Sequence, residues 1–526
     1  MTVQPVLIAD QWRQSDLSGT FQAENPAAKK PLADEYPVSS WDDIDRALDA
    51  ASAAATALRE MPGERIAMFL DLYAAIIESQ AEPLVAMAHA ETALAARPRL
   101  AEVELPRTAS QLRQAAHSAR DGSWMLPTID TKQAIRSCHA PLGPVFVFGP
   151  NNFPLAFNSI VGGDFAAAIA TGNPVIAKAN TSHPGTTRLL GVAAHQAARE
   201  AGLPAGSVQL IYRTSHADGT RAVADPRTAA TGYTGSRSAG LVLKAAADRA
   251  GKPIYLELSS VNPLVMMPGA LAARGEQLAG EFTTSCLMGT GQFCTNPGLV
   301  ILVAGEPTDR FVAAVADKFR AAPVGTLLSR SVAESLAANL KKLAGSGAKV
   351  LAGNTPEGGR GYSFANTLLS ISGGTFLEDP ELWQTEAFGN ATLFVVAKNA
   401  EQAAAIVDAL EGNLTGSIYS QPGDDDALYR ELAPRLRRKV GRLLNDKMPT
   451  GVAVSPAMNH GGPYPATGHP GFTAVGIPAA LRRFTALECY DNVQGDRLPP
   501  ALRNKNPTGT MWRLVDGTWT QADVTV

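Results

Sequence analysis

One cysteine lies in a stretch whose residue types suit nucleophilic chemistry. Cys294 sits among small and polar residues in Gly289–Gly298, and no charged residue occurs between Phe282 and Gly305, so we expect this stretch in the interior. A lone buried cysteine is usually an inert apolar residue, whereas a nucleophile must be partly ionised and reachable by substrate. The flanking glycines favour the nucleophile, because they let the backbone approach a ligand closely and leave amides near the sulfur.

Three other polar residues stand at the ends of short apolar runs that predict β-strands. Asn152 follows the first run, and Lys178 ends the second. Glu257 comes after a third run, where a carboxylate is costly unless it is paired or used in chemistry. Taken alone, Asn152 could cap a turn and Lys178 could be a solvated charge. The carboxylate is therefore the one that points to function from its position alone.

Strands and helices alternate along the middle of the chain. The pattern predicts strands over 143–150, 174–178, 207–212 and 253–256, with helices ending at 170 and spanning 186–201 and 241–250. Such alternation is typical of a doubly wound parallel α/β sheet, which binds ligands at the carboxyl ends of its strands. Gly235, Ser236 and Gly240 lead into the last of these helices, where exposed backbone N–H groups suit a phosphate. Glycine is common in turns, so the glycines alone are weak evidence for a phosphate site. Their position between a strand and a helix makes the evidence stronger.

The alternation repeats between residues 258 and 444. It predicts strands over 299–303 and 349–352 and helices over 309–321 and 331–343. These elements indicate a second α/β unit, with the active site in the cleft between the two units. The segment 445–475 is rich in glycine and proline, and we expect it to return across that cleft. Ahead of both units, residues 41–122 predict helices over 44–58 and 65–90, to which we assign no chemistry.

Bulk composition excludes several classes of protein. The 526 residues can form two or three structural units, and the net charge of -3 offers no surface for nucleic acid or an anionic membrane. The longest uncharged runs are broken by proline, glycine and asparagine, so no membrane span is predicted, and the first residues show no export signal. Four cysteines without CxxC spacing predict neither disulfides nor a zinc site, which suits the cytoplasm. The eight histidines are scattered, and no metal site is predicted.

Several of these motifs occur together in one known order. They are Asn152-Phe153-Pro154, Lys178, Thr234-Gly235-Ser236, Leu256-Glu257-Leu258, Gly291-Gln292-Phe293-Cys294 and Glu386-Ala387-Phe388-Gly389. In this order, over nearly the whole chain, the sequence resembles the aldehyde dehydrogenase superfamily. The stretches Glu257–Pro263, Gly291–Gly298 and Gly461–Thr467 resemble a narrower branch, which includes 2-oxoglutarate semialdehyde (2,5-dioxopentanoate) dehydrogenases and some fatty-aldehyde dehydrogenases.

The resemblance implies a role for each catalytic residue. The thiolate of Cys294 would attack an aldehyde, and its own backbone N–H and the Asn152 amide would stabilise the oxyanion. Hydride transfer to the oxidised cofactor would leave a thioester, which a water activated by Glu257 would hydrolyse to the acid. Because a hydrolytic base is present, an enzyme that passes the acyl group to coenzyme A is not favoured.

The resemblance also implies the cofactor site. Lys178 would bind the adenosine ribose, Glu386 the nicotinamide ribose, and Phe388 would pack near the nicotinamide. NAD-preferring relatives often carry glutamate three residues after the lysine, where this chain has Thr181. Without that acid, Lys178, Thr181 and Arg213 could receive a 2′-phosphate, so we expect NADP or NAD as cofactor, with NADP favoured.

The resemblance implies an aldehyde dehydrogenase-like α/β fold with two doubly wound domains and a small β arm. We expect a dinucleotide-binding domain over 1–122 and 143–256, a catalytic domain over 257–470, and an oligomerisation arm and tail over 123–142 and 482–526. A strand expected over 482–492 would pair between subunits, giving a homodimer or homotetramer. Besides Thr181, the chain differs from many relatives at Ser259-Ser260-Val261, where they have Gly-Gly-Lys. This second difference has no explanation from sequence.

The leading hypothesis is oxidation of 2,5-dioxopentanoate to 2-oxoglutarate with NAD(P). A medium- or long-chain aliphatic aldehyde dehydrogenase is the alternative within the enzyme class, and a non-catalytic binding or structural relative is the alternative outside it. An anionic substrate calls for an arginine in the pocket and a fatty one for an apolar tunnel. Phe153, Phe157 and Phe293 fit either substrate, and no arginine can be placed from sequence.

Overall fold

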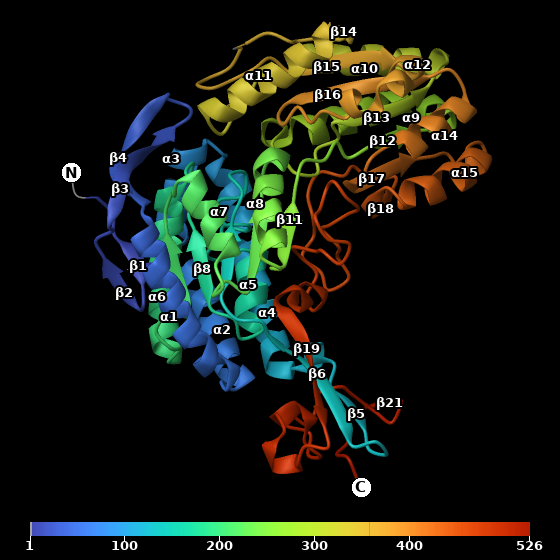
Figure 1. The fold of residues 1–526 in the computed structure, drawn as a ribbon. Coiled ribbons are helices and arrows are strands. Elements are labelled where there is room, and N and C mark those ends of the chain that lie inside the picture. Colours follow the sequence, from blue (N-terminus) through green and yellow to red (C-terminus); the bar gives the residue numbers. More distant parts are fainter. Residues whose placement is uncertain (1–2, 357, 526) are drawn as a thin grey trace.

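The computed structural model describes residues 3–356 and 358–525. Two seven-stranded sheets with helices on both faces lie next to each other, and a smaller sheet extends away from both (Figure 1). The α/β class and the two doubly wound sheets predicted from the sequence are confirmed. No helix among the described residues is long and apolar enough to cross a membrane.

The first sheet has a parallel centre and an antiparallel edge. Its strands in spatial order are β11 (Ile254–Glu257), β10 (Ala230–Thr234), β7 (Val145–Phe148), β8 (Val175–Lys178), β9 (Val208–Ile211), β1 (Val6–Ile8) and β2 (Gln11–Arg13). The strands from β11 to β9 run parallel, whereas β1 pairs antiparallel with β9 and β2 with β1. All four strands predicted for this sheet are therefore present, with ends that differ by at most two residues.

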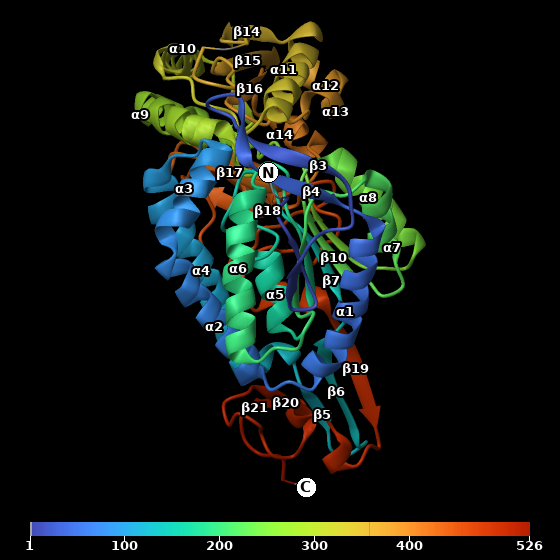
Figure 2. The ribbon, with the colours of Figure 1, turned by 90° about the vertical axis from the view of Figure 1, so that its left-hand side faces the viewer.

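Helices cover both faces of this sheet (Figure 2). On one face lie α2 (Gly63–Ser79), α4 (Leu105–Asp121), α5 (Gly163–Ala170) and α6 (Pro184–Ala201), and on the other α1 (Trp41–Arg59), α7 (His216–Ala224) and α8 (Arg237–Arg249). The single helix predicted over 65–90 is wrong. It is two helices, α2 and α3 (Ala81–Thr92), because Pro83 lacks an N–H and its ring clashes with the carbonyl four residues before it.

The helix expected after Asn152 begins later than predicted. Residues 151–162 form turns, and α5 starts only at Gly163. The side chain of Asn158 donates to the carbonyl of Pro154 at 2.8 Å and to Thr187 Oγ1 at 2.9 Å. These bonds satisfy the backbone and fasten the loop to α6, so the loop that carries Asn152 is ordered without being helical.

The second sheet is parallel except at one edge. Its strands in spatial order are β14 (Lys349–Ala352), β15 (Thr367–Ser372), β16 (Ala391–Ala397), β13 (Leu299–Val303), β12 (Leu264–Met266), β17 (Asn413–Tyr419) and β18 (Val440–Asn445). Only β14 is antiparallel to its neighbour. The helices of this unit are α9 (Pro268–Leu287), α10 (Glu306–Ala321), α11 (Arg330–Gly345), α12 (Gly373–Glu378), α13 (Pro380–Trp383), α14 (Ala400–Ala409) and α15 (Asp426–Arg437).

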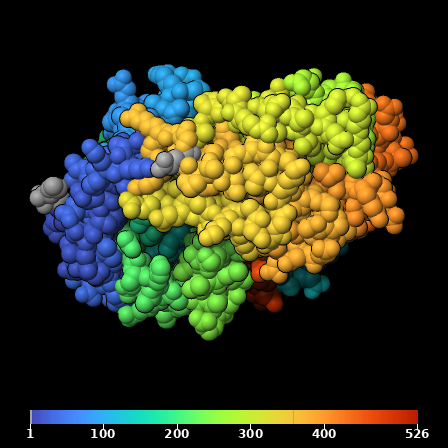
Figure 3. All heavy atoms as spheres, turned by 90° about the horizontal axis from the view of Figure 1, so that it is seen from above, coloured from blue at the N-terminus to red at the C-terminus, as the bar shows by residue number. Residues whose placement is uncertain are grey.

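Two smaller β structures complete the chain. Residues from 123–142 and from 482–526 form one five-stranded sheet, in the order β19 (Thr485–Asp491), β6 (Ile135–Pro141), β5 (Thr128–Asp130), β20 (Arg513–Val515) and β21 (Thr518–Thr520). The hairpin of β3 (Leu17–Asn25) and β4 (Lys30–Ser39) reaches the second unit, where Tyr362 Oη donates to Glu24 at 2.7 Å. From above, the blue N-terminal residues accordingly lie against the yellow ones (Figure 3).

A buried ion pair joins the C-terminal part of the chain to α5. Arg483 Nη1 lies 2.7 Å from Asp164 Oδ1, and both side chains are almost fully buried. Removing one partner leaves an uncompensated buried charge, so we expect Arg483→Met to lower the free energy of unfolding by about 3–5 kcal/mol. Denaturant unfolding measures the loss, and Arg482→Met, at the exposed neighbouring position, is the control. Equal unfolding midpoints for the two variants would contradict the expectation.

Candidate active site

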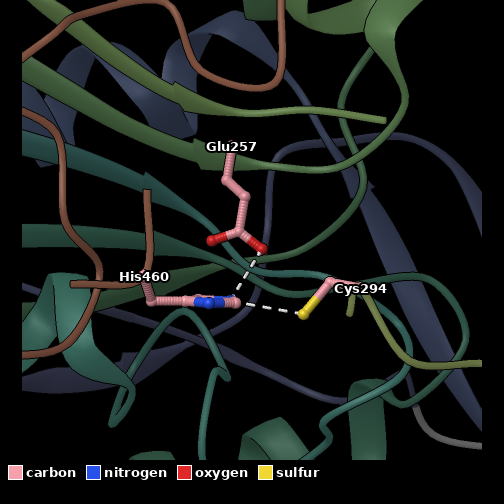
Figure 4. Close-up of side chains that lie close together, drawn as sticks. All are labelled: Glu257, Cys294 and His460. Carbon is pink, nitrogen blue, oxygen red and sulfur yellow. Dashed lines mark hydrogen bonds and ion pairs between the residues drawn. The ribbon is translucent and has the colours of Figure 1, made fainter. Parts of the chain in front are cut away.

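Three side chains distant in sequence meet beside the cleft. The Nε2 atom of His460 lies 3.3 Å from Cys294 Sγ and 3.2 Å from Glu257 Oε1 (Figure 4). His460 and Glu257 are almost completely buried, at 2% and 3% exposure, and Cys294 is partly exposed. One ring nitrogen thus stands between an acid and a thiol, an arrangement suited to moving a proton between them.

The elements that carry these residues explain how they meet. Glu257 is the last residue of β11, at the carboxyl edge of the first sheet, where ligands bind in such folds. The return segment runs antiparallel to it: Leu258 N donates to Ala466 O at 2.8 Å, and Gly468 N donates to Leu256 O at 3.1 Å. This pairing holds the residues around Gly461–Thr467 beside β11 and brings His460 to the carboxylate.

The thiol of Cys294 is neutral in this environment. Burial raises its pKa well above the usual 9.0, the Glu257 carboxylate raises it further, and the guanidinium of Arg107 opposes the shift. A neutral thiol is a poor nucleophile, so a neighbouring group must accept its proton as it attacks. His460 is the side chain whose nitrogen lies within hydrogen-bond distance of the sulfur.

The histidine was missed from the sequence. No metal site was predicted, because no histidine forms a ligand pair with a nearby cysteine or carboxylate at the spacing typical of zinc. In space, however, ligand-type atoms of Glu257, Cys294 and His460 all lie within 4.8 Å of one another. The available signal was that His460 immediately precedes Gly461–Thr467, a stretch already singled out, although nothing in that motif identified its partner. The hydrogen-bond distances suit proton transfer, and we interpret the cluster in that way.

Asn152 lies beside the loop that carries the cysteine. Its Nδ2 atom donates to the carbonyl of Gln292 at 3.1 Å, and its side chain is 5% exposed. The loop of Asn152 is held by Glu104, whose Oε1 accepts from the backbone N–H groups of Leu155 and Ala156 at 2.8 and 2.9 Å. The amide is therefore held in place beside the backbone two residues before Cys294.

The Ser259–Asn262 turn, unexplained from sequence, ties three parts of the site together. The backbone N–H of Ser260 donates to Glu386 Oε1 at 3.3 Å, which holds this carboxylate beside the end of β11. Asn262 Nδ2 donates to the carbonyls of Cys294 and Asn296 at 2.9 and 2.8 Å. Asn262 thus positions the cysteine loop, and the Ser260 backbone positions Glu386. The Ser260 hydroxyl, which a glycine would lack, donates to Asn262 Oδ1 at 2.9 Å and accepts from the backbone N–H of Leu414 at 3.0 Å.

A cavity of about 930 Å³ is lined by four of the eight expected cofactor residues and by the catalytic ones. Among the residues that line it are Asn152, Gly235, Ser236, Glu257, Cys294, Glu386 and Phe388. Ser236 is the N-cap of α8, so the free N–H groups of that helix point toward the cavity. A Cβ at Gly235 would come within 2.7 Å of Tyr233 Oη, so only glycine fits there. These features suit a dinucleotide phosphate.

Gly240 stands apart from the other predicted cofactor residues. A Cβ at this position would lie 2.4 Å from Leu258 Cδ2 and 3.0 Å from Tyr233 Cε1. Gly240 therefore faces the sheet and allows α8 to pack closely against it, instead of facing the cavity. Its effect on a phosphate is limited to placing the helix.

Lys178, Thr181 and Arg213 gather at the neighbouring strand ends. Lys178 closes β8 and pairs in register with Ile211 of β9, two residues before Arg213. Burial and the charge of Arg213 together lower the pKa of Lys178 to about 8. Neither cation forms an ion pair with an acid among the described residues. Two adjacent positive charges without a carboxylate favour an anionic group between them.

Comparisons with known proteins agree with this geometry. The family model described as "Aldehyde dehydrogenase family" matches residues 12–462. The chain belongs to the aldehyde dehydrogenase family. It is 39% identical to alpha-ketoglutaric semialdehyde dehydrogenase 2 of Azospirillum brasilense, covering 95% of this chain and 96% of that protein. It is 35% identical to alpha-ketoglutaric semialdehyde dehydrogenase of Acinetobacter baylyi, with the same shares of each chain covered.

Solved aldehyde dehydrogenases share the fold. A mutant of aldehyde dehydrogenase C from Pseudomonas syringae, in complex with NAD+ and octanal, matches with a TM-score of 0.79 and 21% identity over 93% of this chain and 97% of that one. As a member of this family, the chain is an NAD(P)-dependent aldehyde oxidoreductase. The aldehyde dehydrogenase resemblance stated from the sequence is therefore confirmed, as is its narrower form, since both relatives are semialdehyde dehydrogenases of the expected kind.

Proposed function

We propose that this aldehyde dehydrogenase oxidises 2,5-dioxopentanoate to 2-oxoglutarate. The observation that carries the chemistry is the meeting of Cys294, His460 and Glu257 beside a dinucleotide-sized cavity. The substrate is supported by the two semialdehyde dehydrogenases that resemble the chain over nearly its full length. A long-chain aldehyde and a non-catalytic role are less favoured, because octanal is named only for a 21%-identical relative and a scaffold needs no such cluster.

In the first step, His460 accepts the thiol proton while Cys294 Sγ bonds to the aldehyde carbon. The carbonyl oxygen becomes an oxyanion, which Asn152 Nδ2 and the Cys294 backbone N–H are placed to stabilise. A bound nicotinamide cofactor would supply the chemistry of accepting a hydride. Loss of this hydride from the substrate carbon converts the thiohemiacetal to a thioester. Glu257, whose buried Oε2 has no hydrogen-bond partner among the described residues, then takes a proton from water for hydrolysis.

The chain offers groups for each part of the cofactor. The start of α8, with Gly235 and Ser236, would hold the pyrophosphate. Glu386 and Phe388 would meet the nicotinamide ribose and ring, and burial raises the pKa of Glu386 while Ser260 holds its carboxylate. Lys178, Thr181 and Arg213 would surround the adenosine ribose and its 2′-phosphate. Because Lys178 and Arg213 are positively charged, we propose that the protein prefers NADP to NAD.

An aldehyde panel tests the function. Purified protein is assayed by cofactor absorbance with 2,5-dioxopentanoate, succinate semialdehyde, hexanal and decanal, each with NAD and with NADP. We expect the highest kcat/KM with 2,5-dioxopentanoate. A higher value with decanal would favour the long-chain alternative, and no reduction of either cofactor by any aldehyde would favour the non-catalytic one.

The cofactor preference has its own test at Thr181. Thr181→Glu places a carboxylate where the 2′-phosphate is expected, so we expect the Kd for NADP to rise about 100-fold, since like-charge contact costs several kcal/mol. The Kd for NAD should change little, because a glutamate can bind both ribose hydroxyls. Titration calorimetry measures both constants, with Arg249→Glu at the far end of α8 as the charge control.

The pH dependence of binding gives a second readout of the same site. A phosphate favours charged Lys178, whose pKa in the free protein is about 8, so NADP affinity should fall as pH rises through that value. NAD affinity should be nearly constant over the same range. A strong preference of the unmodified protein for NAD would overturn the NADP proposal.

The remaining expectations concern organisation and location. We propose that the first sheet with its helices (1–122 and 143–256) binds the dinucleotide, and that residues 257–470 form the catalytic domain. The five-stranded sheet of 123–142 and 482–526 has β19 at one edge with open hydrogen-bonding groups, which supports its use in a homodimer or homotetramer. The four cysteines are all free thiols, in keeping with a cytoplasmic location.

A further inference from the structure

A half-buried arginine near the thiol has a buried donor without a partner. Arg107, on α4, donates through Nη1 to the carbonyl of Val452 at 2.8 Å and through Nε to Gln111 Oε1 at 3.4 Å. Its Nη2 is buried and has no hydrogen-bond partner among the described residues. No carboxylate in the described chain lies within ion-pair distance of this guanidinium. A buried donor that stays unused is costly, so it is retained where a ligand completes it.

The neighbouring arginines differ from Arg107 in this respect. Arg99 is paired with Glu104 and also donates to the carbonyl of Asn152, so it holds the catalytic loop. Arg442 uses both of its terminal nitrogens on the backbone carbonyls of Gly451 and Pro449, at 3.1 and 2.7 Å. Of the three, only Arg107 combines a buried terminal nitrogen that has no partner with a guanidinium that has no counter-charge.

Aromatic rings connect Arg107 to the catalytic cluster. The guanidinium carbon lies 4.9 Å from the ring centre of Phe157 and 5.7 Å from that of Phe153. Phe157 also packs against Phe153, at 5.2 Å between ring centres, and against the imidazole of His460, at 5.8 Å. Phe293, next to Cys294, packs edge-on against Phe153 at 5.5 Å. The guanidinium of Arg107 therefore lies at one end of a row of packed aromatic rings, Phe157, Phe153 and Phe293, and the last of these is the residue before Cys294. We call this row the aromatic wall.

This wall lies apart from the cofactor residues. Cys294, Glu257 and Asn152 line the dinucleotide cavity, whereas Arg107 and Phe157 do not. Arg107 nevertheless lowers the pKa of the Cys294 thiol, which shows that its charge is felt at the sulfur.

We propose that Arg107 binds the carboxylate of the substrate at the end opposite the aldehyde, with Nη2 as the donor, and so selects anionic ω-aldehyde acids over uncharged aldehydes. The inference rests on the proposed function, since 2,5-dioxopentanoate carries its carboxylate and its aldehyde at opposite ends of a short chain. Phe153 and Phe157 shield the pair from water, which strengthens a charge-assisted hydrogen bond. The substrate carboxylate then supplies the counter-charge that the protein itself lacks.

A kinetic test uses a matched pair of aldehydes. The kcat/KM values for 5-oxopentanoate and for its uncharged methyl ester are compared in the unmodified protein, Arg107→Met and Arg107→Lys. We expect Arg107→Met to lower the acid-to-ester ratio of kcat/KM about 100-fold. Arg107→Lys keeps the positive charge but loses the planar guanidinium with its paired N–H donors, so we expect it to lower the ratio about 10-fold. Arg113→Met, on the exposed side of the same helix and paired with Glu78, should leave the ratio unchanged. An unchanged ratio in Arg107→Met would overturn the proposal.

A chemical test avoids both turnover and the identity of the substrate. Iodoacetate and iodoacetamide alkylate the same thiol, so any change in the pKa of Cys294 cancels in the ratio of their inactivation rates. We expect Arg107→Met to lower the iodoacetate-to-iodoacetamide ratio at least about 10-fold. If 2,5-dioxopentanoate proves a poor substrate while both ratios still fall, the proposed substrate is wrong and the Arg107 site stands. Equal slowing by the two reagents would instead mean that Arg107 acts only on the thiol or the fold.

Discussion

Cys294→Ala is expected to lower kcat by at least about 10⁵-fold, because it removes the sulfur that forms the covalent intermediate. Cofactor affinity and the thermal unfolding temperature should stay close to those of the unmodified protein, since the side chain is small and partly exposed. Cofactor absorbance at substrate saturation measures the loss. Cys489→Ala, an exposed cysteine on β19, is the control and should keep full activity.

The reactivity of the Cys294 thiol is expected to depend on pH. Its pKa is raised well above 9.0 by burial and by Glu257, so the reactive thiolate becomes more abundant as pH rises and is a small fraction at neutral pH. The rate of alkylation by iodoacetamide should therefore still be increasing at about pH 9. A plateau below about pH 8 would show instead that His460 holds the sulfur ionised, and residual turnover above about 1% in Cys294→Ala would remove the cysteine from the mechanism.

Glu257→Gln is expected to separate the two halves of the reaction. Hydride transfer needs no base on water, so a burst of about one reduced cofactor per site should remain, while hydrolysis of the thioester slows about 10²–10⁴-fold. Rapid mixing measures the burst, and mass spectrometry detects the accumulated acyl-enzyme. Glu82→Gln, at an exposed position of α3, is the control. Undiminished steady-state turnover in Glu257→Gln would contradict the assignment.

His460→Asn provides the complementary result. If the imidazole accepts the thiol proton, this variant should slow the burst itself, whereas Glu257→Gln should leave the burst intact. Because the Glu257 carboxylate raises the pKa of the thiol, Glu257→Gln should also speed alkylation of Cys294 at neutral pH. A burst of normal rate in His460→Asn would leave the imidazole with a structural role only.

Local signals in the sequence were sufficient for six of the fourteen strands in the two large sheets. Apolar runs placed β7, β8, β9 and β13 to within a few residues, because such runs are short and end in turns that their own residues favour. The errors arose where side chains compete with the backbone. Pro83 divides a helix that apolar spacing alone would continue, and Asn158 stabilises turns where helix-forming residues predominate.

The sequence by itself determined the family, the alternation of strands and helices, and the three residue types, thiol, carboxylate and amide, that the chemistry requires. Only the tertiary structure decided what lies beside them. His460 is 166 positions from Cys294, and it reaches the thiol because a return segment pairs with β11. Arg107 reaches the same place on a helix for which the sequence suggested no chemistry. Contacts over such separations follow from the packing of both sheets, which no local pattern encodes.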